Sequence, residues 1–317
     1  MPETPAATRV SDTRTLVVGE ALIDAVTTPD GATTEHVGGS PANVAFGLAA
    51  LEHPVDLATW IGHDARGERI AAHCAERGVT LTEGSRDAAA TSLAHATLDA
   101  SGAATYVFDL GWQLAPVPNL GAYGHVHTGS IAAVIEPGGH EVRAVLEAAR
   151  AAGATISYDP NARPTLMGAP ADARRVIEAA VALADVVKLS DEDVEWLCPG
   201  ESLEAVVRGW GELGPALVVV TRGGQGALVR VTATGEQVSL PTPSVEVVDT
   251  VGAGDSFMAG LVSGLLDAGL LGGAAARERL HAATLADATP SVERALLTGA
   301  LTVQRAGAFA PTRSALR

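Results

Sequence analysis

The segment Asp249-Thr250-Val251-Gly252-Ala253-Gly254-Asp255 is followed directly by Ser256-Phe257-Met258-Ala259-Gly260. Apolar residues then recur four positions apart, which predicts a helix that begins at about Ala253 or Gly254 and is buried over a wide face. A helix that begins on glycines presents unpaired backbone N–H groups and the positive end of its dipole, so it binds an anion without needing a lysine. In its first turn, the carboxylate of Asp255 can take a proton from a hydroxyl group beside that anion.

The overall charge limits how an anion can be bound elsewhere in the chain. The 317 residues carry a formal net charge of −16, with a pI near 4.9, which argues against nucleic acid or an anionic membrane surface as a partner. Lys188 is the only lysine, so the P-loop pattern, which requires Gly-Lys, is absent and a Walker-type kinase is excluded. Any phosphate must therefore be bound by local devices such as helix N-termini.

The same composition suggests where the protein works. Cys74 and Cys198 lack metal-ligand spacing and are typical of reduced thiols in the cytoplasm. Residues 1–15 contain no apolar signal-peptide core, and no apolar run approaches the roughly 18 residues that span a bilayer. We expect a soluble, cytoplasmic protein with a disordered tail over residues 1–13.

Strand and helix patterns alternate along most of the chain. This alternation predicts an α/β fold with a mostly parallel central sheet and helices on both of its faces. Two segments, 91–98 and 103–108, flank a hairpin signal and interrupt the alternation, and together with 33–37 they predict a small sheet that forms a lid. The main strands are expected at 15–18, 55–61, 125–129, 155–158, 185–189, 216–220 and, antiparallel, 227–231, and the helices include 41–51, 137–152, 171–183, 203–213 and 292–303.

Polar residues follow several of the expected strands. Because ligands bind at the carboxyl ends of parallel strands, we expect these residues to face one crevice. In the helix that begins near Pro41, Ser40 is the expected N-cap. Asn43 in its first turn either makes a second capping contact or binds a ligand hydroxyl group. The residues that follow strands are Asp24, Asp159, Ser190, Thr221 and Asp255.

Four separate segments together resemble the ribokinase/PfkB family of carbohydrate kinases over about residues 15–312. The resemblance implies a ribokinase-like three-layer fold, with a kinase domain at 14–312 and lid strands inserted at about 30–38 and 91–112. It also implies ATP-dependent phosphorylation of a primary hydroxyl group of a sugar or nucleoside with Mg²⁺, often with activation by K⁺. The segments are Gly38-Gly39-Ser40-Pro41-Ala42-Asn43-Val44-Ala45, Trp60-Ile61-Gly62-His63-Asp64-Ala65-Arg66-Gly67, Asp159-Pro160-Asn161 with Arg163, and Asp249 to Asp255.

The resemblance also implies roles for individual residues. Asp255 is the general base, and the amides of Gly252, Ala253 and Gly254 form the anion hole. Asp193 acts on Mg²⁺ through water, and Asp249 is a candidate ligand of a monovalent cation. The implied sugar-binding residues are Asp24, Gly38, Gly39, Asn43, Phe108 and Arg163, and the implied nucleotide-binding residues are Lys188, Ser190, Thr221, Gly223, Gly226 and Gly254.

One segment departs from the family pattern. The family carries Asn-x-x-Glu where this chain has Ser190 and Asp193, so the acid is shorter by one methylene. Both residues can still hold metal-bound water molecules. The alternative is that the acidic run from Asp191 to Asp193 only stabilises a helix N-terminus.

Among family members, the chain is most similar to fructokinases, because Gly39 precedes Ser-Pro-Ala-Asn and Asp159 precedes Pro-Asn-Ala-Arg-Pro. The segment from Phe108 to Leu114 differs from fructokinases and leaves 2-keto-3-deoxygluconate kinase, ribokinase or another sugar kinase as alternatives. A sugar-binding regulator without turnover is a further alternative. The pattern disfavours a Rossmann dehydrogenase, since Gly-x-Gly-x-x-Gly does not follow the first strand. We expect sugar and ATP as ligands and a homodimer through the lid.

Overall fold

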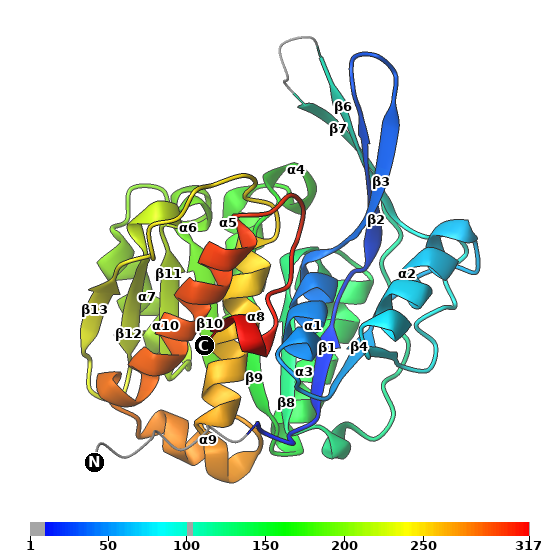
Figure 1. The fold of residues 1–317 in the computed structure, drawn as a ribbon. Coiled ribbons are helices and arrows are strands. Elements are labelled where there is room, and N and C mark those ends of the chain that lie inside the picture. The colour runs from blue at the N-terminus through cyan, green and yellow to red at the C-terminus, as the bar shows by residue number, and fades with distance from the viewer. Residues whose placement is uncertain (1–9, 100–103, 317) are drawn as a thin grey trace.

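This computed structural model describes residues 10–99 and 104–316, so residues 1–9 of the expected disordered tail lie outside the described residues. The central sheet has the strand order β13-β12-β11-β10-β9-β8-β1-β4-β5 (Figure 1). All pairs from β11 to β5 are parallel, and β12 and β13 are antiparallel to their neighbours. The strands are β1 Thr15–Val18, β4 Val55–Ala58, β5 Thr80–Leu81, β8 His125–Gly129, β9 Thr155–Asp159, β10 Val186–Ser190, β11 Leu217–Thr221, β12 Ala227–Val231 and β13 Gln237–Leu240.

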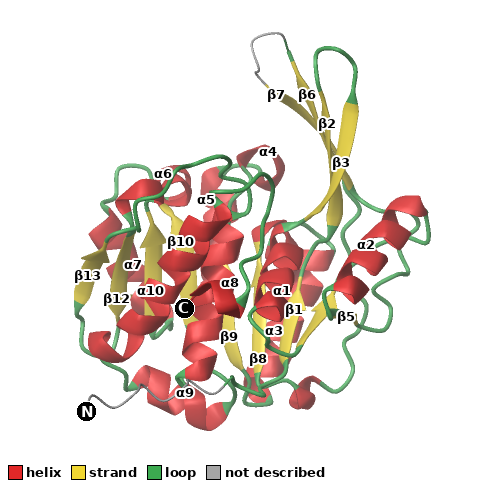
Figure 2. Ribbon diagram, viewed as in Figure 1, coloured by secondary structure: helices red, strands yellow, loops and turns green. Residues whose placement is uncertain are grey.

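Helices cover both faces of this sheet, as Figure 2 shows. The strands between them are rich in valine and leucine and are almost fully buried, as expected for parallel strands with two covered faces. One apolar core lies under α1 Ser40–Ala50, α2 Ala65–Glu76, α8 Ala253–Asp267 and α10 Leu285–Thr302, and a second lies under α3 Gly138–Ala151, α5 Pro170–Val181, α6 Asp191–Leu197 and α7 Leu203–Leu213. Two shorter helices are α4 Pro164–Met167 and α9 Ala274–His281.

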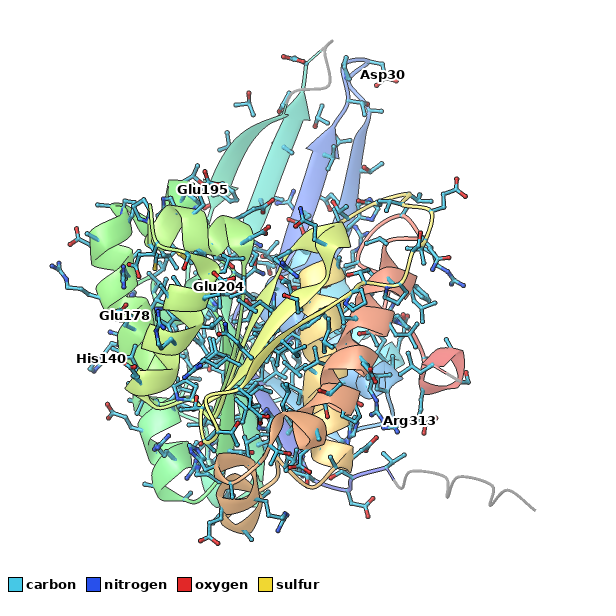
Figure 3. All side chains as sticks on the ribbon, turned by 90° about the vertical axis from the view of Figure 1, so that its left-hand side faces the viewer. Asp30, His140, Glu178, Glu195, Glu204 and Arg313 are labelled. Carbon is cyan, nitrogen blue, oxygen red and sulfur yellow. The ribbon has the colours of Figure 1, made fainter. Side chains whose placement is uncertain are left out.

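A second, four-stranded sheet projects from the main body at the top of Figures 1 and 2. Its order is β3-β2-β6-β7, with β2 parallel to β6 and the outer pairs antiparallel. Asp30, in the turn between β2 and β3, lies at its far end in Figure 3. The predicted α/β class, with a mostly parallel sheet and a separate small sheet, is confirmed. The strands of this lid sheet are β2 Leu22–Thr27, β3 Thr33–Gly38, β6 Leu93–Leu98 and β7 Ala104–Asp109.

The last long helix differs from its predicted bounds of 292–303. It begins at Leu285 and contains Pro290 in its second turn. Its start is stabilised by a capping box in which the Thr284 backbone N–H donates to the Asp287 carboxylate at 2.8 Å. Among the described residues, no helix has both the length and the apolar character needed to cross a membrane.

Candidate active site

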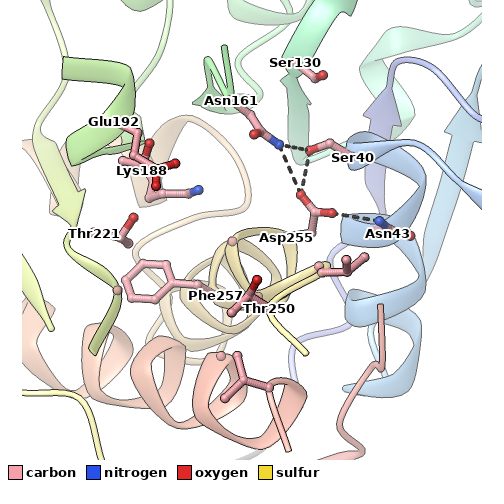
Figure 4. Close-up of a pocket in the computed structure, with 18 of the residues that line it drawn as sticks. Ser40, Asn43, Ser130, Asn161, Lys188, Glu192, Thr221, Thr250, Asp255 and Phe257 are labelled. Carbon is pink, nitrogen blue, oxygen red and sulfur yellow. Dashed lines mark hydrogen bonds between the residues drawn. The ribbon is translucent and has the colours of Figure 1, made fainter. Parts of the chain in front are cut away.

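A cavity of about 870 Å³ lies at the carboxyl ends of five neighbouring strands (Figure 4). Each of these strands contributes a polar residue at or just beyond its last position, which matches the expected crevice. These residues are Glu20 after β1, Ser130 after β8, Asn161 after β9, Ser190 of β10 and Thr221 of β11. The lid, α8 and α10 complete the wall. Of the candidate residues, the cavity is lined by Asp24, Gly39, Asn43, Phe108, Arg163, Lys188, Ser190, Asp193, Thr221, Gly223, Gly226, Gly252, Ala253, Gly254 and Asp255.

The carboxylate of Asp255 is held by side chains from two other elements. The Ser40 hydroxyl donates to its Oδ1 at 2.7 Å, and the Asn43 amide donates to its Oδ2 at 2.8 Å. The Asn161 amide donates to Ser40 Oγ at 2.8 Å and lies 3.4 Å from Asp255 Oδ1. These contacts fix the orientation of a carboxylate that is only 7% exposed. They also correct the expected cap of α1: Gly39 is the N-cap, and the Ser40 hydroxyl bonds to Asp255 instead.

The N-terminus of α8 depends on two glycines. Gly252 is the N-cap, with a φ of +75° that side chains rarely allow, and a Cβ there would lie 2.6 Å from Cβ of Ala308. A Cβ on Gly254 would lie 3.2 Å from Nζ of Lys188. The first N–H groups of a helix have no intrahelical acceptor, so the positive end of α8 and the Lys188 ammonium group face the same part of the cavity.

Lys188 is buried and forms an ion pair with Asp159, with 2.7 Å between Nζ and Oδ2. Burial raises the pKa of Asp159 to about 6, although the charge of Lys188 opposes this. Burial alone would lower the pKa of Lys188, but the carboxylates of Asp159, Asp193 and Asp255 raise it above its ordinary value. Lys188 therefore stays positively charged within reach of the cavity.

The segment that departs from the family pattern forms a capping box at the start of α6. The Ser190 hydroxyl accepts from the Asp193 N–H at 3.0 Å, and Asp193 Oδ2 accepts from the Ser190 N–H at 2.8 Å. Asp193 Oδ1 accepts from the Ala162 N–H at 2.7 Å, which ties α6 to the loop after β9. The acidic run thus stabilises a helix N-terminus and also lines the cavity. Among the described residues, no group of three or more His, Cys, Asp or Glu side chains is arranged to hold a metal ion.

Asp249 and Gly38 lie outside the cavity lining, and so does Asp159, which was expected to face the crevice. Asp24 lines the cavity from within β2 of the lid sheet and does not follow a strand. Asp249 accepts from the Val251 N–H at 3.0 Å and from the Gly307 N–H at 2.8 Å, and these bonds hold its pKa below the usual range. It therefore joins the loop before α8 to the loop after α10. Gly38 lies directly beside the Asp24 carboxylate, where a Cβ would collide with Oδ2.

The lid and the loop after β9 supply the residues at one end of the cavity. Burial raises the pKa of Asp24 to about 6, although Arg163 and His36 oppose this shift. Arg163 is exposed and donates to the backbone and side-chain oxygens of Asn161 at 3.0 and 2.7 Å. Phe108, on β7, also lines this end. The other end of the cavity is lined by three groups of residues. They are Thr221, Gly223 and Gly226 at and after β11, Thr242, Pro243, Val245 and Val247 after β13, and Leu296 and Ala300 of α10 with Val303 directly after it.

Two cavity residues, Glu20 and Ser130, were not identified from the sequence. Burial raises the pKa of Glu20 to about 8, opposed by a hydrogen bond with the Ser130 side chain. Ser130 has a positive φ of 53°. Ser130 directly follows β8 and Glu20 lies two residues after β1, so the rule that ligands bind beyond the carboxyl ends of parallel strands could have found them both.

Comparison with known proteins identifies the family of this chain. Residues 12–315 match the sequence model of the pfkB family carbohydrate kinases. The chain belongs to the pfkB family of carbohydrate kinases. As a member of this family it is a phosphotransferase that acts on a sugar, and its three-layer architecture with a projecting sheet is the ribokinase-like fold.

The similar proteins include several fructokinases. The fructokinase of Klebsiella pneumoniae is 34% identical over 262 residues, which cover 80% of this chain and 85% of that protein. The structure of Xylella fastidiosa fructokinase with bound ATP has a TM-score of 0.83 and 27% identity, and the match covers 96% of this chain and 97% of that one. A Vibrio cholerae fructokinase variant bound to fructose, ADP and potassium has a TM-score of 0.76 and 25% identity, with coverage of 97% and 98%.

Gly252→Ala is expected to lower the free energy of unfolding by about 1–3 kcal/mol, because the new Cβ meets both an unfavourable φ and Ala308. Urea unfolding followed by circular dichroism measures this change. Gly209→Ala in α7 is the matched control, since open space surrounds Gly209 and an alanine there should stabilise the helix by up to about 1 kcal/mol. Equal effects of the two substitutions would contradict the importance of the Gly252 backbone.

Proposed function

We propose that this kinase transfers the γ-phosphoryl group of ATP to a primary hydroxyl group of fructose. The observation that carries the proposal is the Asp255 carboxylate, which Ser40 and Asn43 orient at the N-terminus of α8 inside the cavity. Phosphoryl transfer depends mainly on positioning and on stabilising negative charge, and this arrangement supplies both. The similarity to fructokinases that bind ATP or fructose supports the choice of substrates.

In this mechanism Asp255 is the general base. It accepts the proton of the attacking sugar hydroxyl group, which takes the place of one of the donors now bound to the carboxylate. The amides of Gly252, Ala253 and Gly254 bind the transferring phosphoryl group. Lys188 adds a positive charge beside Gly254. This charge stabilises the negative charge on the phosphate oxygens while the bond between the γ-phosphoryl group and ADP breaks.

The two ends of the cavity are assigned to the two substrates. The sugar lies toward the lid, with Asp24, Gly39 and Asn43 as hydroxyl ligands and with Phe108 and Arg163 beside them. Gly38 acts indirectly, because it leaves room for the Asp24 carboxylate. The nucleotide lies along Lys188, Ser190, Thr221, Gly223 and Gly226, and the apolar segment near Val245 and Val247 suits its base.

The cations that the family uses fit the residues present. When bound, Mg²⁺ would neutralise the phosphate oxygens, and the carboxylate of Asp193 on the cavity wall would bind its water molecules, since no three acids among the described residues are arranged to ligate a metal ion directly. Both Asp193 oxygens already accept N–H bonds, which suits contact through water. For a monovalent cation such as K⁺ we propose Asp249, since each of its oxygens keeps a second lone pair.

Arg163 supports a second candidate substrate. Its exposed guanidinium group lines the sugar end and suits the carboxylate of a sugar acid such as 2-keto-3-deoxygluconate. ADP release with fructose, ribose, 2-keto-3-deoxygluconate, glucose and adenosine discriminates between these acceptors. Turnover on fructose alone supports the leading proposal. Turnover on the sugar acid would instead show that 2-keto-3-deoxygluconate is the substrate and that Arg163 binds its carboxylate.

We also propose that two copies pair through their lid sheets. Val107 of β7, on the projecting sheet, is 65% exposed, and a second copy of the sheet would cover this apolar side chain. Light scattering after size-exclusion chromatography measures the assembly.

Asp255→Asn is expected to lower kcat by roughly 10²–10⁴-fold, because the amide keeps the shape of the carboxylate but cannot accept the proton. The melting temperature should change little. A coupled assay of ADP release measures kcat, and near-wild-type turnover would exclude Asp255 as the base.

Lys188→Met should abolish most turnover and destabilise the protein by about 3–5 kcal/mol, because it leaves Asp159 buried without its partner. The double variant Lys188→Met/Asp159→Asn should recover most of that stability without recovering turnover. Denaturant unfolding and ADP release are measured on the same preparations. If restoring stability also restores turnover, Lys188 has only a structural role.

A further inference from the structure

Three carboxyl groups, those of Glu20, Asp24 and Asp255, line the sugar end of the cavity, against the single guanidinium group of Arg163. So many acids in a partly enclosed site cannot all ionise at low cost, because each negative charge disfavours the next. Asp255 is bound by hydrogen-bond donors that suit a carboxylate. Glu20 is the most buried of the three, at 6% exposure, and unlike Asp255 it has an oxygen without a hydrogen-bond donor among the described residues.

The carboxyl group of Glu20 has an unused hydrogen-bonding atom. Within residues 10–99 and 104–316, its Oε2 is buried and has no hydrogen-bond partner. Ser130 lines the same cavity, its side chain lowers the pKa of this carboxyl group, and its backbone has a positive φ that serine seldom adopts. Leaving a buried polar atom unsatisfied is costly, and a strained backbone conformation of this kind is typical of functional sites. Both features are explained if a ligand completes the hydrogen bonding.

We propose that Glu20, as a neutral carboxylic acid, and the hydroxyl group of Ser130 together bind a sugar hydroxyl group other than the one that is phosphorylated. A hydroxyl group both donates and accepts a hydrogen bond, and a protonated carboxyl group does the same, so the pair is complementary without adding charge beside Asp255. Glu20 is therefore a specificity-determining residue of the sugar site. This inference rests on the proposed sugar kinase activity.

The charges around Glu20 determine how it responds to pH. Arg163, after β9, favours the ionised form, and Asp255, on α8, disfavours it, while burial has the largest effect and keeps the carboxyl group neutral up to a pKa of about 8. Above this pH a second carboxylate forms beside the base and the donated hydrogen bond is lost. The value of kcat/KM for the sugar should consequently fall as pH rises through about 8.

The test compares Glu20→Ala and Glu20→Gln with wild type on fructose and on its single-centre epimers psicose, tagatose and sorbose. In Glu20→Ala, KM for fructose should rise by roughly 10–100-fold while KM for ATP stays within about twofold, and the preference for fructose over one epimer should collapse. Glu20→Gln should keep both KM and preference within about threefold, because the amide is neutral and also donates and accepts. It should also lose the decline of kcat/KM above pH 8. Glu147→Gln, an exposed acid on α3, is the matched control and should change nothing.

Calorimetric titration of fructose without ATP separates this inference from the proposed function. Absence of wild-type turnover on every sugar would overturn the proposed function. If wild type turns over or binds fructose and Glu20→Ala has the same KM and the same epimer preference, the role of Glu20 alone is overturned. Equal impairment of Glu20→Gln and Glu20→Ala would also overturn it, because an ionised carboxylate would then be required. If Glu20→Ala does not fold, the pH profile and epimer preference of Glu20→Gln and Ser130→Ala decide, and loss of preference is expected in Ser130→Ala only.

Discussion

The hydrogen bonds to the Asp255 carboxylate connect the parts of this molecule that must act together. Ser40 and Asn43 come from α1, Asn161 comes from the loop after β9, and Asp255 itself belongs to α8. These segments are far apart in sequence. They meet because β1 and β9 are the two neighbours of β8 in the parallel sheet, so the carboxyl ends of all three strands lie side by side. The buried carboxylate needs these donors, since a charge without them would be costly in this position. One constraint thus orients the proposed base and joins the two sides of the cavity.

The acidity of the chain explains the design of the phosphate end. With a net charge of −16, the protein cannot rely on its general field to attract a nucleotide. Its only lysine, Lys188 of β10, lies beside Gly254 at the N-terminus of α8. There the full positive charge of the lysine adds to the partial positive charges of the backbone N–H groups. Asp159 keeps Lys188 charged in spite of burial. Other acids, such as Glu178 of α5 and Glu195 of α6, lie on the outside of the molecule in Figure 3.

Much of the fold could be predicted because local patterns and tertiary structure agree. The expected strands at 15–18, 125–129 and 227–231 and the helix at 203–213 have the observed bounds, since each is an apolar run or amphipathic period with clear ends. The position of the site followed from the rule for parallel sheets. Pairings between distant side chains could not be predicted, and Ser40 illustrates this: its local pattern suits a helix cap, but a carboxylate 215 positions away takes its hydroxyl group.

Glu20 was missed for a related reason, because its burial depends on elements that fold over it. In sequence, the acid after β1 is indistinguishable from a solvated residue, and only the closure of α1 and the loop after β8 removes it from water. Gly39 contributes to this closure, since its φ of +103° and lack of a side chain let α1 begin directly against the backbone of Glu20. The same glycine therefore permits the helix that orients Asp255 and covers the acid beside it. A side chain at position 39 would move α1 away from both carboxyl groups, so the proposed base Asp255 and the proposed sugar-binding residue Glu20 share one structural requirement.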